Sequence, residues 1–140
     1  MPSKVFFDTN LFVYQLDNSN PHKQATANTL IRQAVADGQG CISYQVVQEC
    51  LNVITRKAAV VVDSLTAQRY LDVVLAPLMT VPASANLFHE GLAIQARYRF
   101  SFYDAMIVAA AISVGCTTLY SEDLQHGQMI GALQIHNPFL

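Results

Sequence analysis

Short runs of β-forming residues alternate along this chain with longer stretches of helical periodicity, and this alternation restricts the folds open to it. Strands are expected at residues 4–7, 40–43, 78–81, 117–120 and 134–136. Helices are expected at residues 11–16, 21–37, 44–57, 65–76, 84–97 and 102–114, with residues 60–62 either a strand or part of a helix–helix connection. Strands joined by long helical crossovers pair in parallel. The sequence therefore predicts an α/β fold, a three-layer α/β/α sandwich with a short, mostly parallel central sheet.

The composition fits one folded domain spanning residues 1–140. Hydrophobic residues make up 52% of the chain and charged residues only 13%, against roughly 25% charged in a typical globular protein. The longest apolar run covers residues 105–112, much shorter than the ~20 residues of a membrane span. The N-terminus offers no signal-peptide apolar region. We therefore expect a cytoplasmic protein with no membrane association.

The three cysteines, Cys41, Cys50 and Cys116, lie far apart in sequence and each has apolar neighbours. Their spacing matches no zinc motif. We interpret them as buried free thiols, because free cysteine usually behaves as a small hydrophobic residue.

Four acidic residues lie in apolar sequence at the ends of strands or on helices. Asp8 follows the first strand and Asp123 follows the strand at 117–120, while Asp104 lies in the first turn of its helix. Glu49 falls on the apolar stripe of its helix, so it should face inward. Carboxylates rarely lie against a core unless their charge is compensated. One divalent cation would compensate several of them at once.

The predicted topology brings these acids together. In an open α/β sheet, ligands bind beyond the carboxyl ends of the strands, which is where Asp8 and Asp123 lie. The helix dipole favours the ionised form of Asp104. Ligands that are all oxygen suit Mg²⁺ or Mn²⁺ and not zinc. The pattern therefore predicts a metal site able to act on phosphate esters.

Each acid also has a purely structural interpretation. Asp8 and Asp104 are good helix caps, and Asp123 is a common type of turn residue. Glu122 beside it is expected to be a solvated neighbour. A purely structural role is hardest to assign to Glu49. It is even harder to explain by chance why all four acids lie at positions compatible with one site.

The formal charge of −2 alone argues against a nucleic-acid partner, but this objection disappears if a metal neutralises the four acids. The chain has 8 basic and 10 acidic residues, and without the four acids 6 acidic residues face 8 basic ones. Arg97 and Arg99 flank Tyr98 just before Asp104, and such a mixture of basic and aromatic residues can contact RNA. A solvated helix end is the structural alternative for these arginines.

The ordered set of motifs resembles the PIN domain family, which includes the VapC-type toxins of toxin–antitoxin pairs. The resemblance covers essentially the whole chain and rests on Phe7-Asp8-Thr9-Asn10, the inward Glu49, Phe102-Tyr103-Asp104-Ala105 and Leu119-Tyr120-Ser121-Glu122-Asp123-Leu124. It implies that Asp8, Glu49, Asp104 and Asp123 bind Mg²⁺ or Mn²⁺. It also implies that Asn10 and Ser121 support the site by hydrogen bonding.

The same resemblance implies an activity and partners. The expected reaction is in-line attack by a metal-activated water on an RNA phosphodiester, so the chain would be an endoribonuclease. The expected partners are a small cognate antitoxin and a second copy of the chain in a homodimer.

Two other functions remain open from the sequence. A haloacid-dehalogenase-like phosphatase also begins with an Asp after a buried strand, but it needs a second Asp two positions later, where this chain has Asn10. A non-catalytic binding module on the same fold is the other alternative, and retention of all four acids disfavours it.

Overall fold

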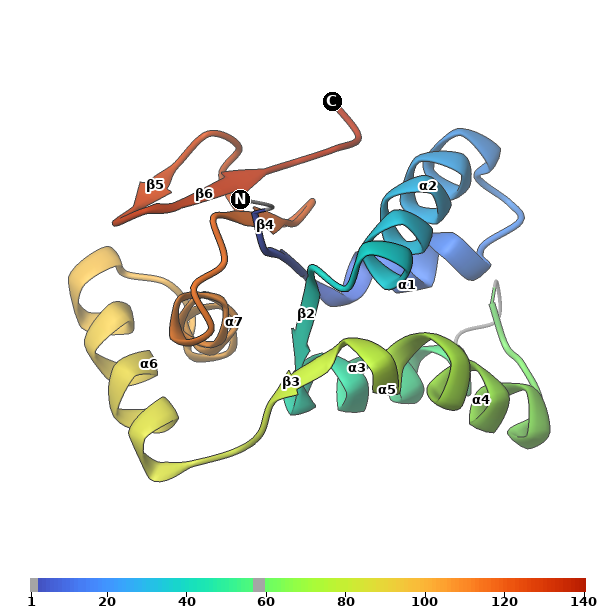
Figure 1. Ribbon diagram of the computed structural model, residues 1–140, viewed down its shortest axis with the longest axis horizontal. Helices are drawn as coiled ribbons and strands as arrows, with labels where there is room; N and C mark the ends of the chain where they lie inside the picture. Colours follow the sequence, from blue (N-terminus) through green and yellow to red (C-terminus); the bar gives the residue numbers. More distant parts are fainter. Residues whose placement is uncertain (1–2, 57–59) are drawn as a thin grey trace.

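A six-stranded sheet forms the centre of the computed structural model, which describes residues 3–56 and 60–140 (Figure 1). The strand order is β3-β2-β1-β4-β6-β5. The strands are β1 (Val5–Phe7), β2 (Gly40–Ser43), β3 (Met79–Val81), β4 (Thr118–Tyr120), β5 (Met129–Ile130) and β6 (Leu133–His136). Neighbouring strands pair in parallel except for the β5–β6 hairpin, which is antiparallel. The predicted α/β class and mostly parallel sheet are therefore confirmed.

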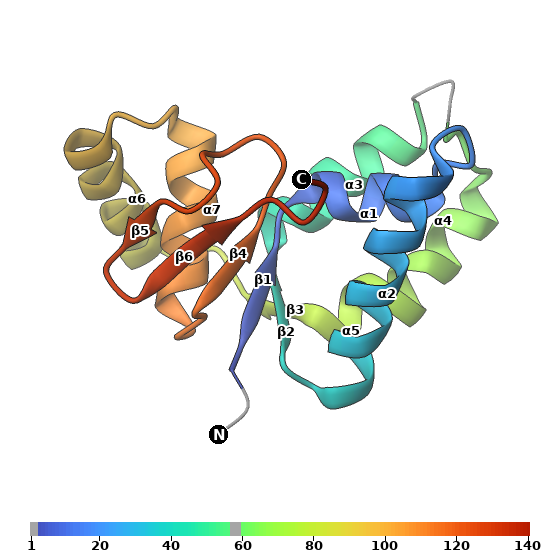
Figure 2. The ribbon, with the colours of Figure 1, turned by 90° about the horizontal axis from the view of Figure 1, so that it is seen from above.

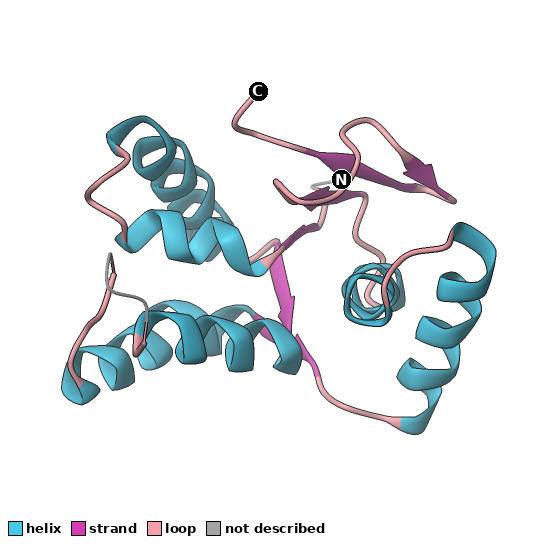
Figure 3. Cartoon of the chain, turned by 180° about the vertical axis from the view of Figure 1, so that it is seen from behind, coloured by secondary structure: helices cyan, strands magenta, loops and turns pink. Residues whose placement is uncertain are grey.

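Helices cover both faces of this sheet. They are α1 (Thr9–Leu16), α2 (Pro21–Asp37), α3 (Tyr44–Ile54), α4 (Ser64–Tyr70), the π-helical turn η1 (Leu71–Leu75), α5 (Ala76–Leu78), α6 (Ala85–Tyr98) and α7 (Phe102–Ser113). Helices α6 and α7 lie on one face, and the α1–α2 pair and the α3–α5 group lie on the other (Figures 1 and 2). The view from behind shows the same three layers with the strands between them (Figure 3).

Helix α7 forms the core of the helical layer on one face of the sheet, and its residues from Ala105 to Ala111 are all buried. A helix that is apolar on all sides needs partners all round, and here they are the sheet and α6. Gly91 on α6 allows the close approach, because a Cβ at this position would lie 2.2 Å from Sδ of Met106. This packing fixes the start of α7, where Asp104 lies.

One expected helix end is wrong. Pro77 was expected to close the helix that begins near residue 65, but the helix continues through Pro77 to Leu78. The backbone N–H of Ala76 bonds to the carbonyl of Leu71, five residues earlier. Proline lacks an N–H and crowds the preceding turn of an α-helix. The wider π turn just before Pro77 accommodates it.

Other differences are small. Strand β5 was not predicted, because two residues are too few to show a periodicity. Residues 60–62 belong to the connection between α3 and α4, and the predicted end of the earlier helix at residue 57 lies outside the described residues. All three cysteines are buried and free, as predicted. Among the helices of residues 3–56 and 60–140, none has the length and apolar character needed to cross a membrane.

Candidate active site

Asp8 lies at the junction between β1 and α1. Its backbone N–H bonds to the carbonyl of Tyr120 on the neighbouring strand at 2.9 Å. Its Oδ1 accepts a hydrogen bond of 2.8 Å from the backbone N–H of Thr9, and so caps α1. Its Oδ2 accepts one of 2.8 Å from the hydroxyl of Ser121. The side chain is buried, so this carboxylate is held at the base of the site.

Ser121 joins the ends of two neighbouring strands. It follows β4 and is completely buried. Besides donating to Asp8, its Oγ accepts hydrogen bonds from the backbone N–H groups of Asp123 at 3.2 Å and Leu124 at 3.4 Å. One hydroxyl therefore orients Asp8 and shapes the segment that carries Asp123.

Asn10 lies in the first turn of α1 and faces Asp123. Its Nδ2 donates a hydrogen bond of 3.1 Å to Oδ2 of Asp123. Its Oδ1 is buried and has no hydrogen-bond partner among the described residues. Buried polar atoms are rarely left unpaired in folded proteins. This oxygen therefore points to a missing partner at the site, such as a water or a cation.

Glu49 faces inward from α3, as its position on the apolar stripe predicted. Its Oε1 accepts hydrogen bonds of 3.3 Å from the hydroxyl of Thr9 and 3.3 Å from Nε2 of Gln45. The Gln45 amide also donates to the backbone carbonyl of Tyr103 at 3.2 Å. Gln45 thus connects Glu49 to the first turn of α7, which carries Asp104.

Asp104 is the third residue of α7. Its backbone N–H donates to the hydroxyl of Ser101 at 3.3 Å, so Ser101, and not Asp104, caps this helix. The side chain is only partly buried. The capping alternative therefore does not account for the Asp104 carboxylate.

The four carboxylates influence one another electrostatically. Burial raises the pKa of Asp8 to about 6, with the negative charges of Asp123 and Glu49 adding to the effect and the hydrogen bonds from Ser121 and Thr9 opposing it. Burial also raises the pKa of Glu49, and the charges of Asp104 and Asp123 act in the same direction. Neighbouring carboxylates that must be desolvated resist ionisation. A counter-charge beside Asp8 and Glu49 would therefore favour their ionised forms.

Two of the four acids, Glu49 and Asp123, line a cleft of about 540 Å³ between α1, α3 and the segment after β4. Asp17, Glu122 and Asn10 line it with them. Among the described residues, no three His, Cys, Asp or Glu side chains lie close enough to hold one ion. The donors still fit a hard divalent cation, because they are oxygens and because Oδ1 of Asn10 lacks a partner among the described residues.

The sequence did not reveal several residues that organise this site. Thr9 and Gln45 position Glu49. The expectation that Glu122 is a solvated neighbour is wrong: it accepts hydrogen bonds from Lys23 and Tyr14 and is half-buried. Lys23 and Glu122 are 99 residues apart. Such a separation leaves no local signal in the sequence.

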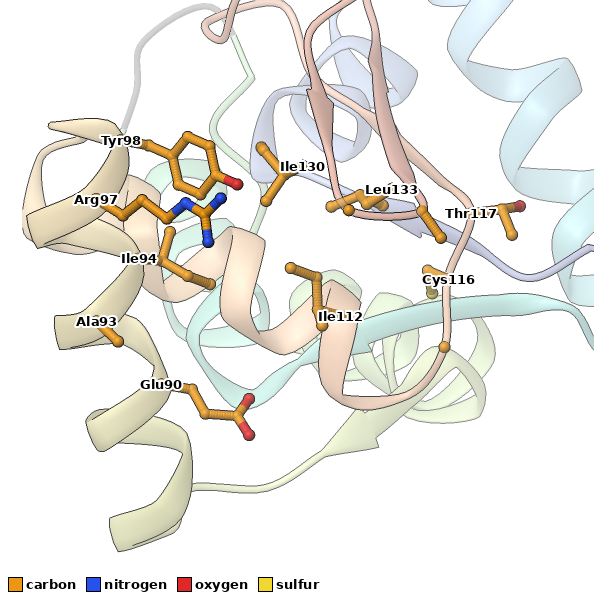
Figure 4. A pocket seen from close by; sticks show the side chains of 13 residues that line it. Glu90, Ala93, Ile94, Arg97, Tyr98, Ile112, Cys116, Thr117, Ile130 and Leu133 are labelled. Atoms are coloured by element: carbon orange, nitrogen blue, oxygen red, sulfur yellow. The ribbon is translucent and has the colours of Figure 1, made fainter.

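Arg97 and Arg99 do not line the acidic cleft. Arg97 lies on α6 with its guanidinium 5.3 Å from the centre of the Tyr98 ring, on the wall of a second groove of about 500 Å³ formed with α7 and the β5–β6 hairpin (Figure 4). Arg99 caps α6 in the left-handed region with a φ of 62°. Both arginines are exposed.

Comparison with known proteins agrees with this architecture. A toxin–antitoxin complex from Klebsiella pneumoniae is 18% identical, with a TM-score of 0.67 over 96% of this chain and 98% of that chain. VapC20 from Mycobacterium tuberculosis, described as a toxin that cleaves the sarcin–ricin loop, is 19% identical, with a TM-score of 0.60 over 86% of this chain and 90% of that one. DNA-bound VapBC from Salmonella typhimurium is 20% identical, with a TM-score of 0.63 over 98% and 99%.

A sequence search finds no match among curated proteins. The family model of the PIN domain, in contrast, matches residues 5–129, which include all four acids. The chain therefore belongs to the PIN domain family.

Proposed function

We propose that this protein is a metal-dependent endoribonuclease, the toxin of a type II toxin–antitoxin pair. The observation that carries the proposal is the mutual electrostatic influence of four carboxylates from four separate segments. Two of them, Glu49 and Asp123, line one cleft at the carboxyl edge of the sheet. Membership of the PIN domain family supports nuclease chemistry. So do the solved structures of similar fold, whose descriptions name a toxin–antitoxin complex and a toxin that cleaves the sarcin–ricin loop.

Asp8, Glu49, Asp104 and Asp123 are the proposed metal ligands, and the proposed ion is Mg²⁺ or Mn²⁺. When bound, such an ion supplies Lewis acidity and charge neutralisation for phosphodiester hydrolysis. The protein contributes the arrangement of the ligands. Ser121 holds Asp8, while Asn10 holds Asp123.

RNA binding is proposed to extend beyond the acidic cleft. Arg97 and Arg99 are exposed cations near the start of α7, and cations of this kind contact phosphates. The place of Arg97 on a separate groove suits contact with nucleotides away from the bond that is cut. Replacing both with alanine should raise KM and leave kcat nearly unchanged.

The proposed partners are a small antitoxin and a second copy of the chain, acting in the cytoplasm. Phe88 and Leu92, one turn apart on α6, are 40% and 51% exposed, and an exposed apolar stripe favours association. We therefore place the homodimer contact on α6. Phe88→Asp with Leu92→Asp should give a monomer in light scattering, whereas Leu65→Asp on α4 should not.

The decisive test is cleavage of RNA by the purified protein with Mg²⁺ or Mn²⁺, with EDTA, and by Asp8→Asn. We expect cleavage that requires metal and disappears in the variant. Asp72→Asn is the matched control, because Asp72 is an exposed carboxylate outside the cluster. Undiminished cleavage by Asp8→Asn would sink the assignment of the site.

The two alternative functions give different results in this test. A phosphatase of the haloacid-dehalogenase type needs an acid at position 10, but here the Asn10 amide donates to Asp123. A non-catalytic binding module would cleave no RNA with any metal. For the toxin assignment, expression alone should slow host growth, and co-expression of the small neighbouring gene should relieve it.

A further inference from the structure

We propose that Lys23 and Tyr14 are positioning residues that hold Asp123 in place by fixing the side chain of its neighbour Glu122. We call Lys23, Tyr14 and Glu122 together the Glu122 clamp. This inference rests on the proposed function, since it assigns the clamp a role in metal binding.

The contacts within the Glu122 clamp are short and reciprocal. Nζ of Lys23 lies 2.5 Å from Oε2 of Glu122, and the Tyr14 hydroxyl donates to Oε1 at 2.5 Å. The Lys23 ammonium also donates to the Tyr14 hydroxyl at 3.2 Å. Both carboxylate oxygens of Glu122 are therefore engaged, one by α1 and one by α2.

Two aromatic rings hold the ammonium group of Lys23 in this position. It lies 4.8 Å from the centre of the Tyr14 ring and 5.6 Å from that of Phe139. The two rings pack edge to face, with centres 5.0 Å apart. Such rings attract a cation electrostatically. The side chain of Lys23 is consequently less free than that of an ordinary surface lysine.

The position of Glu122 in the chain gives the clamp its significance. Three consecutive residues after β4 are each fixed by a different contact: Ser121 by Asp8, Glu122 by the clamp, and Asp123 by Asn10. Asp123 is exposed, and its side chain accepts a hydrogen bond from Asn10. The backbone of Glu122 therefore decides where the Asp123 carboxylate lies.

The clamp also removes a competing charge from the cleft. Glu122 lines the same cleft as Glu49 and Asp123. Lys23 lies 2.5 Å from one carboxylate oxygen of Glu122, and the Tyr14 hydroxyl donates to the other. The Glu122 carboxylate is thus paired with a cation. Without Lys23 it would add a free anion beside the four proposed ligands.

The test is Lys23→Met and Glu122→Gln, with Lys23→Arg as the conservative variant. Lys4→Met is the matched control, because Lys4 donates to the Val114 carbonyl and takes no part in the clamp. Binding of Mn²⁺ is measured by calorimetry. We expect the dissociation constant to rise by about 5- to 20-fold in Lys23→Met and Glu122→Gln, and to stay within twofold of wild type in Lys23→Arg and Lys4→Met.

A second measurement needs no metal. Hydrogen exchange at the amides of Asp123 and Leu124, which donate to Ser121, should accelerate about tenfold or more in Lys23→Met, while amides in the middle of α7 keep their rates. If exchange at these two amides is unchanged in Lys23→Met, the proposed role of the Glu122 clamp is wrong. If wild type binds no Mn²⁺ but the exchange rates respond, the clamp stands as a positioning device and the metal-dependent function fails.

A reversed pair completes the design. Lys23→Glu combined with Glu122→Lys should recover slow exchange at Asp123 relative to either single reversal, because only the double variant restores opposite charges. An additive result would show that the two side chains act independently, contrary to the proposal.

Discussion

The hydroxyl of Ser121 donates a hydrogen bond of 2.8 Å to Oδ2 of Asp8, and this contact joins the ends of β4 and β1 across 113 residues of sequence. It opposes the effect of burial, and on balance the pKa of Asp8 is raised to about 6. Ser121 therefore lowers the pH at which Asp8 ionises.

Replacing Ser121 with alanine should raise the pKa of Asp8 further, because burial remains while a stabilising donor is lost. We expect the midpoint of the pH dependence of Mn²⁺ binding to move upward by roughly 1 pH unit. Calorimetric titrations at a series of pH values would measure it. Ser113→Ala is the control, since the Ser113 hydroxyl donates to the Ala110 carbonyl within its own helix. A midpoint that stays in place would refute the role of the hydroxyl.

Asp8→Asn should stabilise the metal-free protein at neutral pH. The pKa of Asp8 is raised in the folded state, from 3.8 to about 6, so the unfolded chain gives up this proton more readily. The resulting penalty is absent below about pH 4, grows between pH 4 and 6, and is complete above it. The expected gain is about 1 to 3 kcal/mol at pH 7.5 and nearly zero at pH 4.

Urea unfolding at both pH values would measure this gain, with Asp72→Asn as the control that should change little at either pH. A loss of stability at pH 7.5 in Asp8→Asn would mean that the carboxylate stabilises the fold, contrary to the raised pKa.

Adding Mn²⁺ should stabilise the wild-type protein against heat. A ligand present at 100 times its dissociation constant adds about 2.7 kcal/mol. Because the carboxylates must be ionised to bind the ion, the gain should shrink as the pH falls through 6. Differential scanning calorimetry with and without EDTA would measure it. Equal stabilisation of wild type and Asp8→Asn would place the ion elsewhere.

Gly91→Ala should destabilise the protein by about 1 to 3 kcal/mol, because the new Cβ would lie 2.2 Å from Sδ of Met106. Adding Met106→Ala to Gly91→Ala makes room for the methyl group. If steric conflict is the cause, the loss caused by Gly91→Ala should be smaller in the Met106→Ala background than in wild type. Denaturant unfolding of wild type, the two single variants and the double variant would measure these losses of stability. If Gly91→Ala costs the same stability in both backgrounds, the steric clash is excluded as the cause.

Much of this molecule could be predicted because its main signals are local. The ends of β1 and β4 follow from short apolar runs, and the inward position of Glu49 follows from helical spacing. The end of the helix at Pro77 was predicted wrongly, because the π turn before Pro77 accommodates the proline and lets the helix continue. The pairing of Glu122 could not be predicted either, because its partners Lys23 and Tyr14 lie far away in sequence.

The place of β4 in the sheet determines when the candidate site can form during synthesis of the chain. Since β4 inserts between β1 and β6, Asp8 meets Ser121 and Asp123 only after β4 has been synthesised. Synthesis proceeds at about 5 to 20 residues per second, so Asp8 and Glu49 wait for seconds before the acids that follow β4 exist. The candidate site of this PIN domain is therefore assembled late in the synthesis of the domain.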